Sequence, residues 1–274
     1  MREVLRLPPG RNGWVRLAEP HGRLHHWHHH EEPEFNLVLR GSARYLLADR
    51  RYDLGRHGLV WLFPRQEHLL VDMSPDFACW IGVMRPADLR QVIGSDSRYA
   101  GLLDPDPPGG FCRRLEASGA AFLDRLCHDL SEADSGAAIR FNAGLRYLLL
   151  AAWDRFSSAG ALDSTALHPG LEQAVALLAR QPSADISAVV SASGLSRWHL
   201  SRLFRSELGT TLTAWRSRVR VERALALHRQ RPRAGWLELG LEAGFGSYAQ
   251  FHRAFTSVTG VGPRRWLGTG DAAR

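Results

Sequence analysis

An internal repeat in the second half of the chain constrains its fold more than any other feature. The segment GLSRWHLSRLFRSELG, residues 194–209, returns as GFGSYAQFHRAFTSVTG, residues 244–260. The copies share glycines at both ends and apolar residues between them: Gly194 aligns with Gly244, Leu200 with Phe251, Arg202 with Arg253, Phe204 with Phe255, Gly209 with Gly260 and Trp215 with Trp266. One structural unit is therefore used twice.

The first copy has the pattern of a helix-turn-helix. Residues 171–180 and 186–193 predict two helices, and Gly194 suits the tight turn that follows them. Ser196 is a favourable N-cap for a third helix that runs to about Leu208. Two helices joined by a glycine turn are typical of DNA-binding proteins, in which the second of them enters the major groove.

The second copy repeats this pattern after a long spacer. Residues 235–243 predict its support helix, Gly244 its turn, and Ser247 the cap of a helix over 248–258. The spacer helix, from Leu212 to about residue 229, would span about 27 Å. Successive major-groove faces of B-DNA lie roughly 34 Å apart, so we expect two reading helices on one side of the duplex.

The outward positions of the two reading helices are the candidate DNA contacts. They are Arg197, Trp198, Ser201, Arg202 and Arg205 in the first helix, and Tyr248, Ala249, His252 and Arg253 in the second. Because only Arg253 is a long cation in the second set, we expect the first helix to supply most base readout and the second to bind largely through phosphates. A packing role for Trp198 and a solvated His252 are the alternatives.

Charge is divided unevenly along the chain. Residues 1–164 contain 20 Arg and 21 Asp+Glu, whereas residues 165–274 contain 15 Arg and 7 Asp+Glu. The sequence has no lysine, so every cation is a guanidinium that can bind phosphate or guanine with two hydrogen bonds. A GC-rich genome would also explain the preference for arginine. A basic segment beside a neutral one indicates a nucleic-acid partner.

The N-terminal part has the pattern of an antiparallel β domain. Runs rich in Leu, Val and aromatic residues are separated by turn residues, as is typical of a sandwich or barrel; they cover 34–40, 42–48, 58–63, 67–72 and 77–84. Residues 1–24 predict a loose arm or a first strand, and residues 85–110 a connector.

Histidines within this β domain form a candidate metal site. His28 and His30 are two residues apart, so they face the same side of a strand. Glu34 and His68 could complete the site from neighbouring strands. Three imidazoles and a carboxylate suit one divalent transition metal, Zn, Ni, Fe or Mn. Because other histidines surround these positions, an interior that binds an organic ligand without metal is the alternative.

Two helices are predicted between the β domain and the repeat. Their apolar residues recur at helical spacing: Leu115, Phe122, Leu126 and Leu130 in residues 115–134, and Ile139, Leu145, Leu149, Trp153 and Phe156 in residues 137–156. We expect these stripes to form a homodimer interface, with packing inside one chain as the alternative. Residues 157–170 have the composition of a linker.

Residues 171–267 resemble the DNA-binding domain of AraC/XylS-family bacterial transcription regulators. The motifs that carry the resemblance are GLSRWHLSRLF, RVRVERALAL, SYAQFHRAF and GVGPRRW. Val190 and Gly240 depart from it, since the family has a small alanine at both positions. The spacing of Gly22, His28, His30, Glu34 and Gly41, and then Gly58, Pro64 and His68, resembles the two motifs of metal-binding cupins. Gln66 stands where those cupins have glycine.

The resemblances imply an α+β protein of two domains. Residues 1–110 would form a cupin-like jelly-roll barrel, 111–157 a helical dimerisation segment, 158–170 a linker and 171–274 an all-α tandem helix-turn-helix domain. The implied function is a sequence-specific transcription regulator, activator or repressor, that binds double-stranded operator DNA as a homodimer. A metal or small molecule in the barrel would be its effector, and RNA polymerase is a candidate partner.

Several other classes of protein are disfavoured. No apolar run approaches the roughly 18 residues that a membrane span needs, and the N-terminus lacks the apolar region of a signal peptide, so we expect a cytoplasmic protein. Cys79, Cys112 and Cys127 lack metal-site spacing, so we expect buried free thiols. The rival function is a metal-dependent cupin oxygenase or isomerase with a DNA-binding tail, although we identify no catalytic residues. A barrel that only dimerises is the third option.

Overall fold

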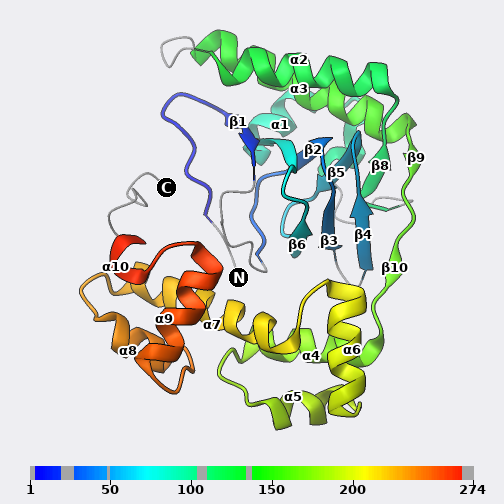
Figure 1. The fold of residues 1–274 in the computed structure, drawn as a ribbon. Helices are drawn as coiled ribbons and strands as arrows, with labels where there is room; N and C mark the ends of the chain where they lie inside the picture. The colour runs from blue at the N-terminus through cyan, green and yellow to red at the C-terminus, as the bar shows by residue number, and fades with distance from the viewer. Residues whose placement is uncertain (1–3, 20–27, 48–49, 104–109, 134–137, 267–274) are drawn as a thin grey trace. The chain divides into compact units, whose positions relative to one another are not determined.

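A computed structural model describes residues 4–19, 28–47, 50–103, 110–133 and 138–266 (Figure 1). The chain divides into two compact units, and the division falls between Thr165 and Ala166. The first unit holds the predicted β domain and the two helices that follow it, and the second holds the repeat.

The first unit contains two antiparallel sheets. The strands are β1 (Gly13–Ala18), β2 (Glu34–Arg40), β3 (Ala43–Leu47), β4 (Arg50–Leu54), β5 (Gly58–Leu62), β6 (His68–Met73), β7 (Ala78–Met84), β8 (Cys112–Arg114), β9 (Gly160–Ala161) and β10 (Thr165–Ala166). One sheet has the order β1-β7-β2-β5-β8-β9 and the other β10-β4-β3-β6. The predicted antiparallel β domain is confirmed, but the two sheets do not close into a barrel over the described residues.

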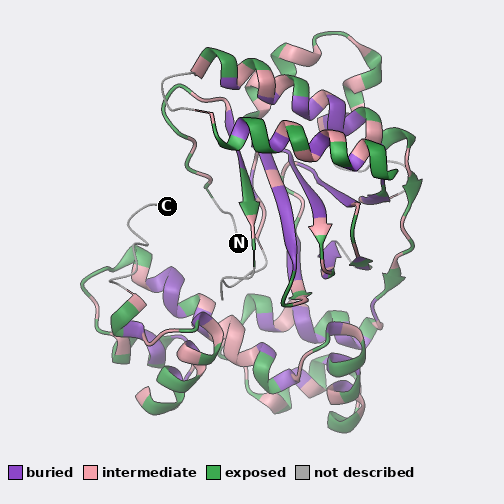
Figure 2. Ribbon diagram, turned by 45° about the horizontal axis from the view of Figure 1, so that its top comes forward, coloured by how far each residue is buried: buried purple, intermediate pink, exposed green. Residues whose placement is uncertain are grey.

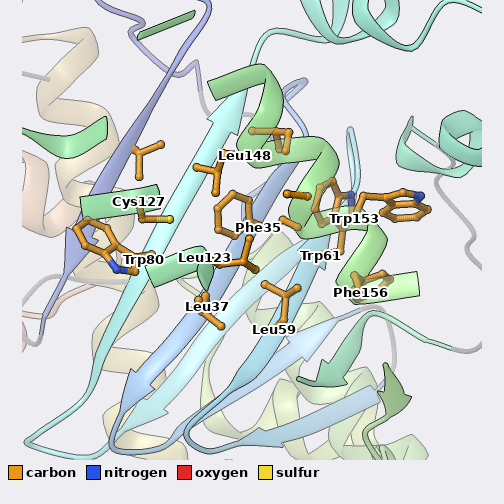
Figure 3. Close-up of a cluster of buried hydrophobic side chains, with 14 of the residues drawn as sticks. Phe35, Leu37, Leu59, Trp61, Trp80, Leu123, Cys127, Leu148, Trp153 and Phe156 are labelled. Atoms are coloured by element: carbon orange, nitrogen blue, oxygen red, sulfur yellow. The ribbon is translucent and has the colours of Figure 1, made fainter. Parts of the chain in front are cut away.

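The central strands of the six-stranded sheet are buried on both faces (Figure 2). In β2, Phe35 and Leu37 belong to a hydrophobic core that includes the helices after the sheet (Figure 3). Val38 belongs to a second core, which also includes Tyr45 and Leu47 of the other sheet. Since successive residues of a strand point to opposite faces, β2 presents Glu34, like Val38, to the space between the sheets.

Several segments of the first unit differ from the prediction, among them the short strand β8 in the expected helical segment and β9 and β10 in the expected linker. The region after the β runs is not a bare connector, because it contains the helix α1 (Pro86–Ile93) and the 3-10 helix η1 (Ser97–Leu103). Strand β4 was also missed, since its sequence RRYDL is mostly polar; only Tyr52 and Leu54 face the core. Within the N-terminal arm only Gly13–Ala18 form a strand, β1, among the described residues. Gly22 of the cupin-like motif lies outside the described residues.

The helices α2 (Ala117–Ser131) and α3 (Ala138–Ser158) pack against the six-stranded sheet. Most of the predicted apolar stripe of α3 is buried within this core, so the packing alternative accounts for most of it. Helix α2 buries Leu123 and Cys127 more fully than Phe122 of the predicted stripe, and Ile139 of the α3 stripe is 89% exposed. The free, buried state predicted for the three cysteines is confirmed.

The second unit is helical and contains both copies of the repeat. Its helices are α4 (Pro169–Arg180), α5 (Ile186–Ser193), α6 (Arg197–Leu208), α7 (Leu212–Gln230), α8 (Trp236–Glu242), α9 (Tyr248–Thr259) and α10 (Pro263–Trp266). The predicted helix-turn-helix layout is confirmed in both copies. None of the described helices of either unit is long and apolar enough to span a membrane.

Turn and cap residues define the start of each reading helix. Gly194 adopts a left-handed conformation with φ 64°, which costs glycine little. The Ser196 side chain accepts a hydrogen bond from the backbone N–H of His199, and Ser247 does the same for Gln250. Each serine satisfies one of the unpaired N–H groups of its helix.

The two support helices contact their reading helices differently. A Cβ atom at Gly240 would lie 2.7 Å from Cγ of Phe251, so the α8 backbone approaches the α9 ring too closely for alanine. In this chain the glycine thus makes room for Phe251, the residue that aligns with Leu200 of the first copy. Val190 on α5 is only half-buried, so its extra volume is accommodated.

This contact predicts that Gly240→Ala destabilises the second unit, although alanine favours helices by about 1 kcal/mol over glycine. Overpacking of this kind costs typically about 1–3 kcal/mol. Urea denaturation of the full chain, followed by the helical circular dichroism signal, measures the change. The loss should shrink in a Phe251→Leu background, where the side chain is smaller. A stabilising Gly240→Ala substitution would contradict the packing described.

Candidate functional site

The structure brings the predicted metal ligands together in the first unit. His28 pairs with His68 in an antiparallel bridge, with backbone N–O distances of 3.3 and 3.0 Å. One ring nitrogen from each of His28, His30 and His68 lies within 4.8 Å of the others. Glu34 Oε2 lies 3.1 Å from His30 Nε2. The three imidazoles therefore converge between β2 of one sheet and β6 of the other, and Glu34 joins the cluster through its contact with His30.

Backbone carbonyls orient two of the imidazoles. His30 Nδ1 lies 2.8 Å from the carbonyl oxygen of Glu32, and His68 Nδ1 lies 2.9 Å from that of Gln66. Since a carbonyl can only accept, each Nδ1 donates its proton, and each Nε2 faces the cluster. His68 Nε2 is buried and has no hydrogen-bond partner among the described residues. This is the arrangement that metal-binding histidines use to hold their ring orientation.

The members of the cluster differ in their protonation. Burial lowers the pKa of His68 to about 3, with help from the neighbouring His28, so His68 is neutral at ordinary pH. Burial alone would raise the pKa of Glu34, but the hydrogen bond and charge of His30 lower it to about 2. Burial alone would lower the pKa of His30, but the hydrogen bond and charge of Glu34 raise it. The cluster thus contains a buried carboxylate and a neutral His68, whereas His30 would have to release a proton to bind a metal ion.

Two residues that the sequence analysis did not select support this cluster. Asn36 is buried, and its Nδ2 donates a hydrogen bond of 3.0 Å to Glu34 Oε1. Gln66 supplies the carbonyl that holds His68, and its own Oε1 accepts from the backbone N–H of Phe63. The sequence could have predicted the role of Asn36, because a polar residue two positions from Glu34 on a buried strand faces the same side as Glu34. Gln66 acts through its backbone, which a sequence pattern does not reveal.

In the second unit, helix α6 presents its predicted contact residues to solvent. Arg197, Trp198, Arg202 and Arg205 are exposed and Ser201 is half-buried, whereas Leu200, Leu203 and Phe204 are buried. Trp198 is 70% exposed, so it does not pack against the spacer helix. The Arg202 guanidinium lies 4.8 Å from the centroid of the Trp198 ring, and this cation–π contact holds the cation over the exposed face.

Helix α9 exposes fewer arginines than α6, but a basic groove lies beside it. Ala249, His252 and Arg253 are exposed, and Tyr248 is half-buried. A groove of 490 Å³ lies between α9 and α10, and its lining residues are Tyr248, His252, Thr256, Gly262, Arg264 and Arg265. No carboxylate is among these residues, so the groove suits an anion such as a DNA phosphate.

Two family models match the chain. One, described as an AraC-like ligand binding domain, matches residues 15–149, and the other, described as a helix-turn-helix domain, matches residues 189–269. Together with the fold, these matches define a DNA-binding transcription regulator with an N-terminal ligand-binding domain. The chain belongs to the AraC family. Neither match supports the alternative of a cupin enzyme.

Solved structures of AraC-type regulators resemble the chain at low identity. ToxT of Vibrio cholerae, in a structure with bound unsaturated fatty acid, is 11% identical over 95% of this chain and 96% of its own, with a TM-score of 0.39. The C-terminal domain of AraT from Geobacillus stearothermophilus is 23% identical over 38% of this chain and 88% of its own, with a TM-score of 0.35. No curated protein matches the chain.

Proposed function

We propose that this regulator reads its operator mainly through α6 and responds to one divalent transition metal held by His28, His30, Glu34 and His68. The observation that carries the metal proposal is the buried, unpartnered Nε2 of His68, which faces two further imidazoles and a carboxylate within the described part of the chain. The effector would thus be a cation, bound in the domain that the family uses for ligands.

The exposed arginines of α6 support its role as the main reading helix. Arg202 lies at the centre of this face, beside Trp198. An arginine that forms two hydrogen bonds to guanine contributes roughly 1–3 kcal/mol of discrimination between bases. Helix α9 offers Arg253 on its exposed face and the groove with Arg264 and Arg265 at its side. This distribution favours phosphate contacts for the second reading helix.

Base readout by α6 and phosphate binding by α9 predict different effects for Arg202→Ala and Arg253→Ala. Arg202→Ala should reduce binding to the selected operator by roughly 5- to 150-fold and relax base preference at one or two positions, because it removes a base contact. Arg253→Ala should weaken operator and random DNA similarly and should lower the slope of log K against log salt by about 1. Titrations of fluorescent DNA at several salt concentrations measure both. A larger loss of base preference in Arg253→Ala would reverse the assignment.

A metal ion in the histidine cluster would connect the two sheets of the first unit. Glu34 belongs to β2 of the six-stranded sheet and His68 to β6 of the four-stranded sheet. His28 and His30 precede β2 and would complete the ligand set. The ion would supply a coordination bond to each sheet, and the chain's carbonyls at Glu32 and Gln66 would keep the imidazoles in place.

Elemental analysis of protein purified without a histidine tag tests the metal site. After incubation with Zn(II), Ni(II), Fe(II) or Mn(II) and dialysis, we expect about one ion per chain for one of these metals, as its ligand set implies. His68→Ala should lose the ion, whereas His128→Ala should retain it, because His128 is an exposed histidine of the same unit. Wild-type protein without metal, or metal retained in folded His68→Ala, would reject the site and leave an organic effector.

We also propose a homodimer formed by α2 and α3. Although much of their apolar surface is buried within the chain, Ile139 and Tyr147 are exposed, and Tyr147 contacts the ring of the half-buried Phe122. Ile139 belongs to the predicted stripe and Tyr147 does not, and packing within one chain leaves both side chains exposed. An activator of this type would also contact RNA polymerase.

A further inference from the structure

Two arginines of the spacer helix bind the loop that joins the first two helices of the second unit. Arg220 Nε donates to the carbonyl oxygen of Pro182 at 2.9 Å, and its Nη2 donates to those of Ser183 and Ala184 at 3.1 and 3.3 Å. Arg216 Nη2 adds a bond of 2.8 Å to Ala184. The loop between α4 and α5 is therefore held against the middle of α7.

The turn of the second copy meets the same loop. A Cβ atom added at Gly244 would lie 2.7 Å from Cα of Ser183 and 3.3 Å from Nε of Arg220. The equivalent turn glycine of the first copy, Gly194, would gain no neighbour within 4 Å. Both glycines have positive φ, 97° and 64°, so both serve a turn. Of these two glycines, only Gly244 also allows the second copy to contact the loop at Ser183.

Arg220 extends this contact into the core of the second copy. Its guanidinium carbon lies 5.9 Å from the centroid of the Phe245 ring, and Phe245 belongs to the hydrophobic cluster beneath α9. Burial, together with the charge of Arg216, lowers the pKa of Arg220. The guanidinium is thus desolvated and held by carbonyl oxygens, an arrangement that suits the planar fork of arginine better than lysine.

We infer that Arg220, together with the contact of Gly244 with Ser183, fixes α6 and α9 at one separation and so determines the spacing of the two DNA half-sites. Helix α7 is the covalent connection between the copies, and without the Arg220 and Gly244 contacts each copy could tilt about its own end of that helix. The direct contact adds a second connection. It makes Arg220 a positioning residue, because it acts on DNA through the geometry of the two reading helices.

This inference rests on the proposed function, since it requires that both α6 and α9 bind DNA. One added base pair moves a half-site by about 3.4 Å and rotates it by about 35°. If α6 and α9 are held rigidly, only one of them can bind its half-site after the change in spacing. The gain in affinity that comes from binding two half-sites at once is then lost. If the two helix-turn-helix copies are free to tilt, both α6 and α9 can still bind their half-sites at the altered spacing.

The test uses the full chain and an operator selected from random DNA, in which one base pair is added or removed between the half-sites. We expect wild-type protein to lose at least about tenfold in affinity on the altered spacing. Arg220→Ala should lose less than about threefold, and Arg220→Lys should remain closer to Ala than to the wild type. Arg223→Ala, an exposed arginine on the same helix, is the control and should keep the wild-type selectivity.

Three results separate the possible failures. If folded Arg220→Ala discriminates spacing as strongly as the wild type, the inference is wrong. If Arg220→Ala does not fold, Arg216→Ala replaces it under the same criterion, because it removes one bond to the same loop. If Arg202→Ala leaves operator binding unchanged, the proposed function fails instead, whatever the spacing data show.

Discussion

The first unit depends on a strand that is buried on both faces. Because successive residues of β2 point to opposite sides, Phe35 and Leu37 anchor the helices α2 and α3, while Glu34 lies between the two sheets. The same alternation that builds the core therefore places a carboxylate in a space from which water is largely excluded. A buried carboxylate is stable only with a partner, and His30 provides one at 3.1 Å. Packing and the candidate effector site thus follow from one pattern of residues.

The second unit shows how a repeat can diverge while its fold persists. Both copies retain the turn glycine and the serine cap, which the backbone requires. They differ where side chains meet. Phe251 replaces Leu200 and lies against Gly240, and a Cβ atom at Gly244 would meet Ser183 whereas one at Gly194 would meet no atom of the described residues within 4 Å. The charged faces differ in the same way, since α6 exposes three arginines and α9 one. We infer that one copy has specialised in reading bases and the other in fixing position.

Local patterns predicted most of the fold and of the candidate site. Helix boundaries in the repeat followed from glycine turns and serine caps, and most strands from apolar runs between turn residues. The strand β4 was missed because only Tyr52 and Leu54 interrupt its polar sequence, and the helix α1 because it has eight residues and buries only Leu89. The convergence of His28, His30, Glu34 and His68 was expected from spacing. The supporting carbonyl of Gln66 was not expected, because it acts through the backbone. The Arg220 contacts were not expected either, because they join segments that are far apart in the sequence.

The central claim is that a cation in the first unit controls DNA binding by the second. The most direct measurement is the Kd of tag-free protein for its selected operator, with the metal that it retains and after removal of that metal by a chelator. Our account predicts a change in Kd of about 5- to 150-fold, as is typical of allosteric coupling, in the wild type but not in His68→Ala. The same Kd with and without metal, in protein that elemental analysis shows to be loaded, would contradict it.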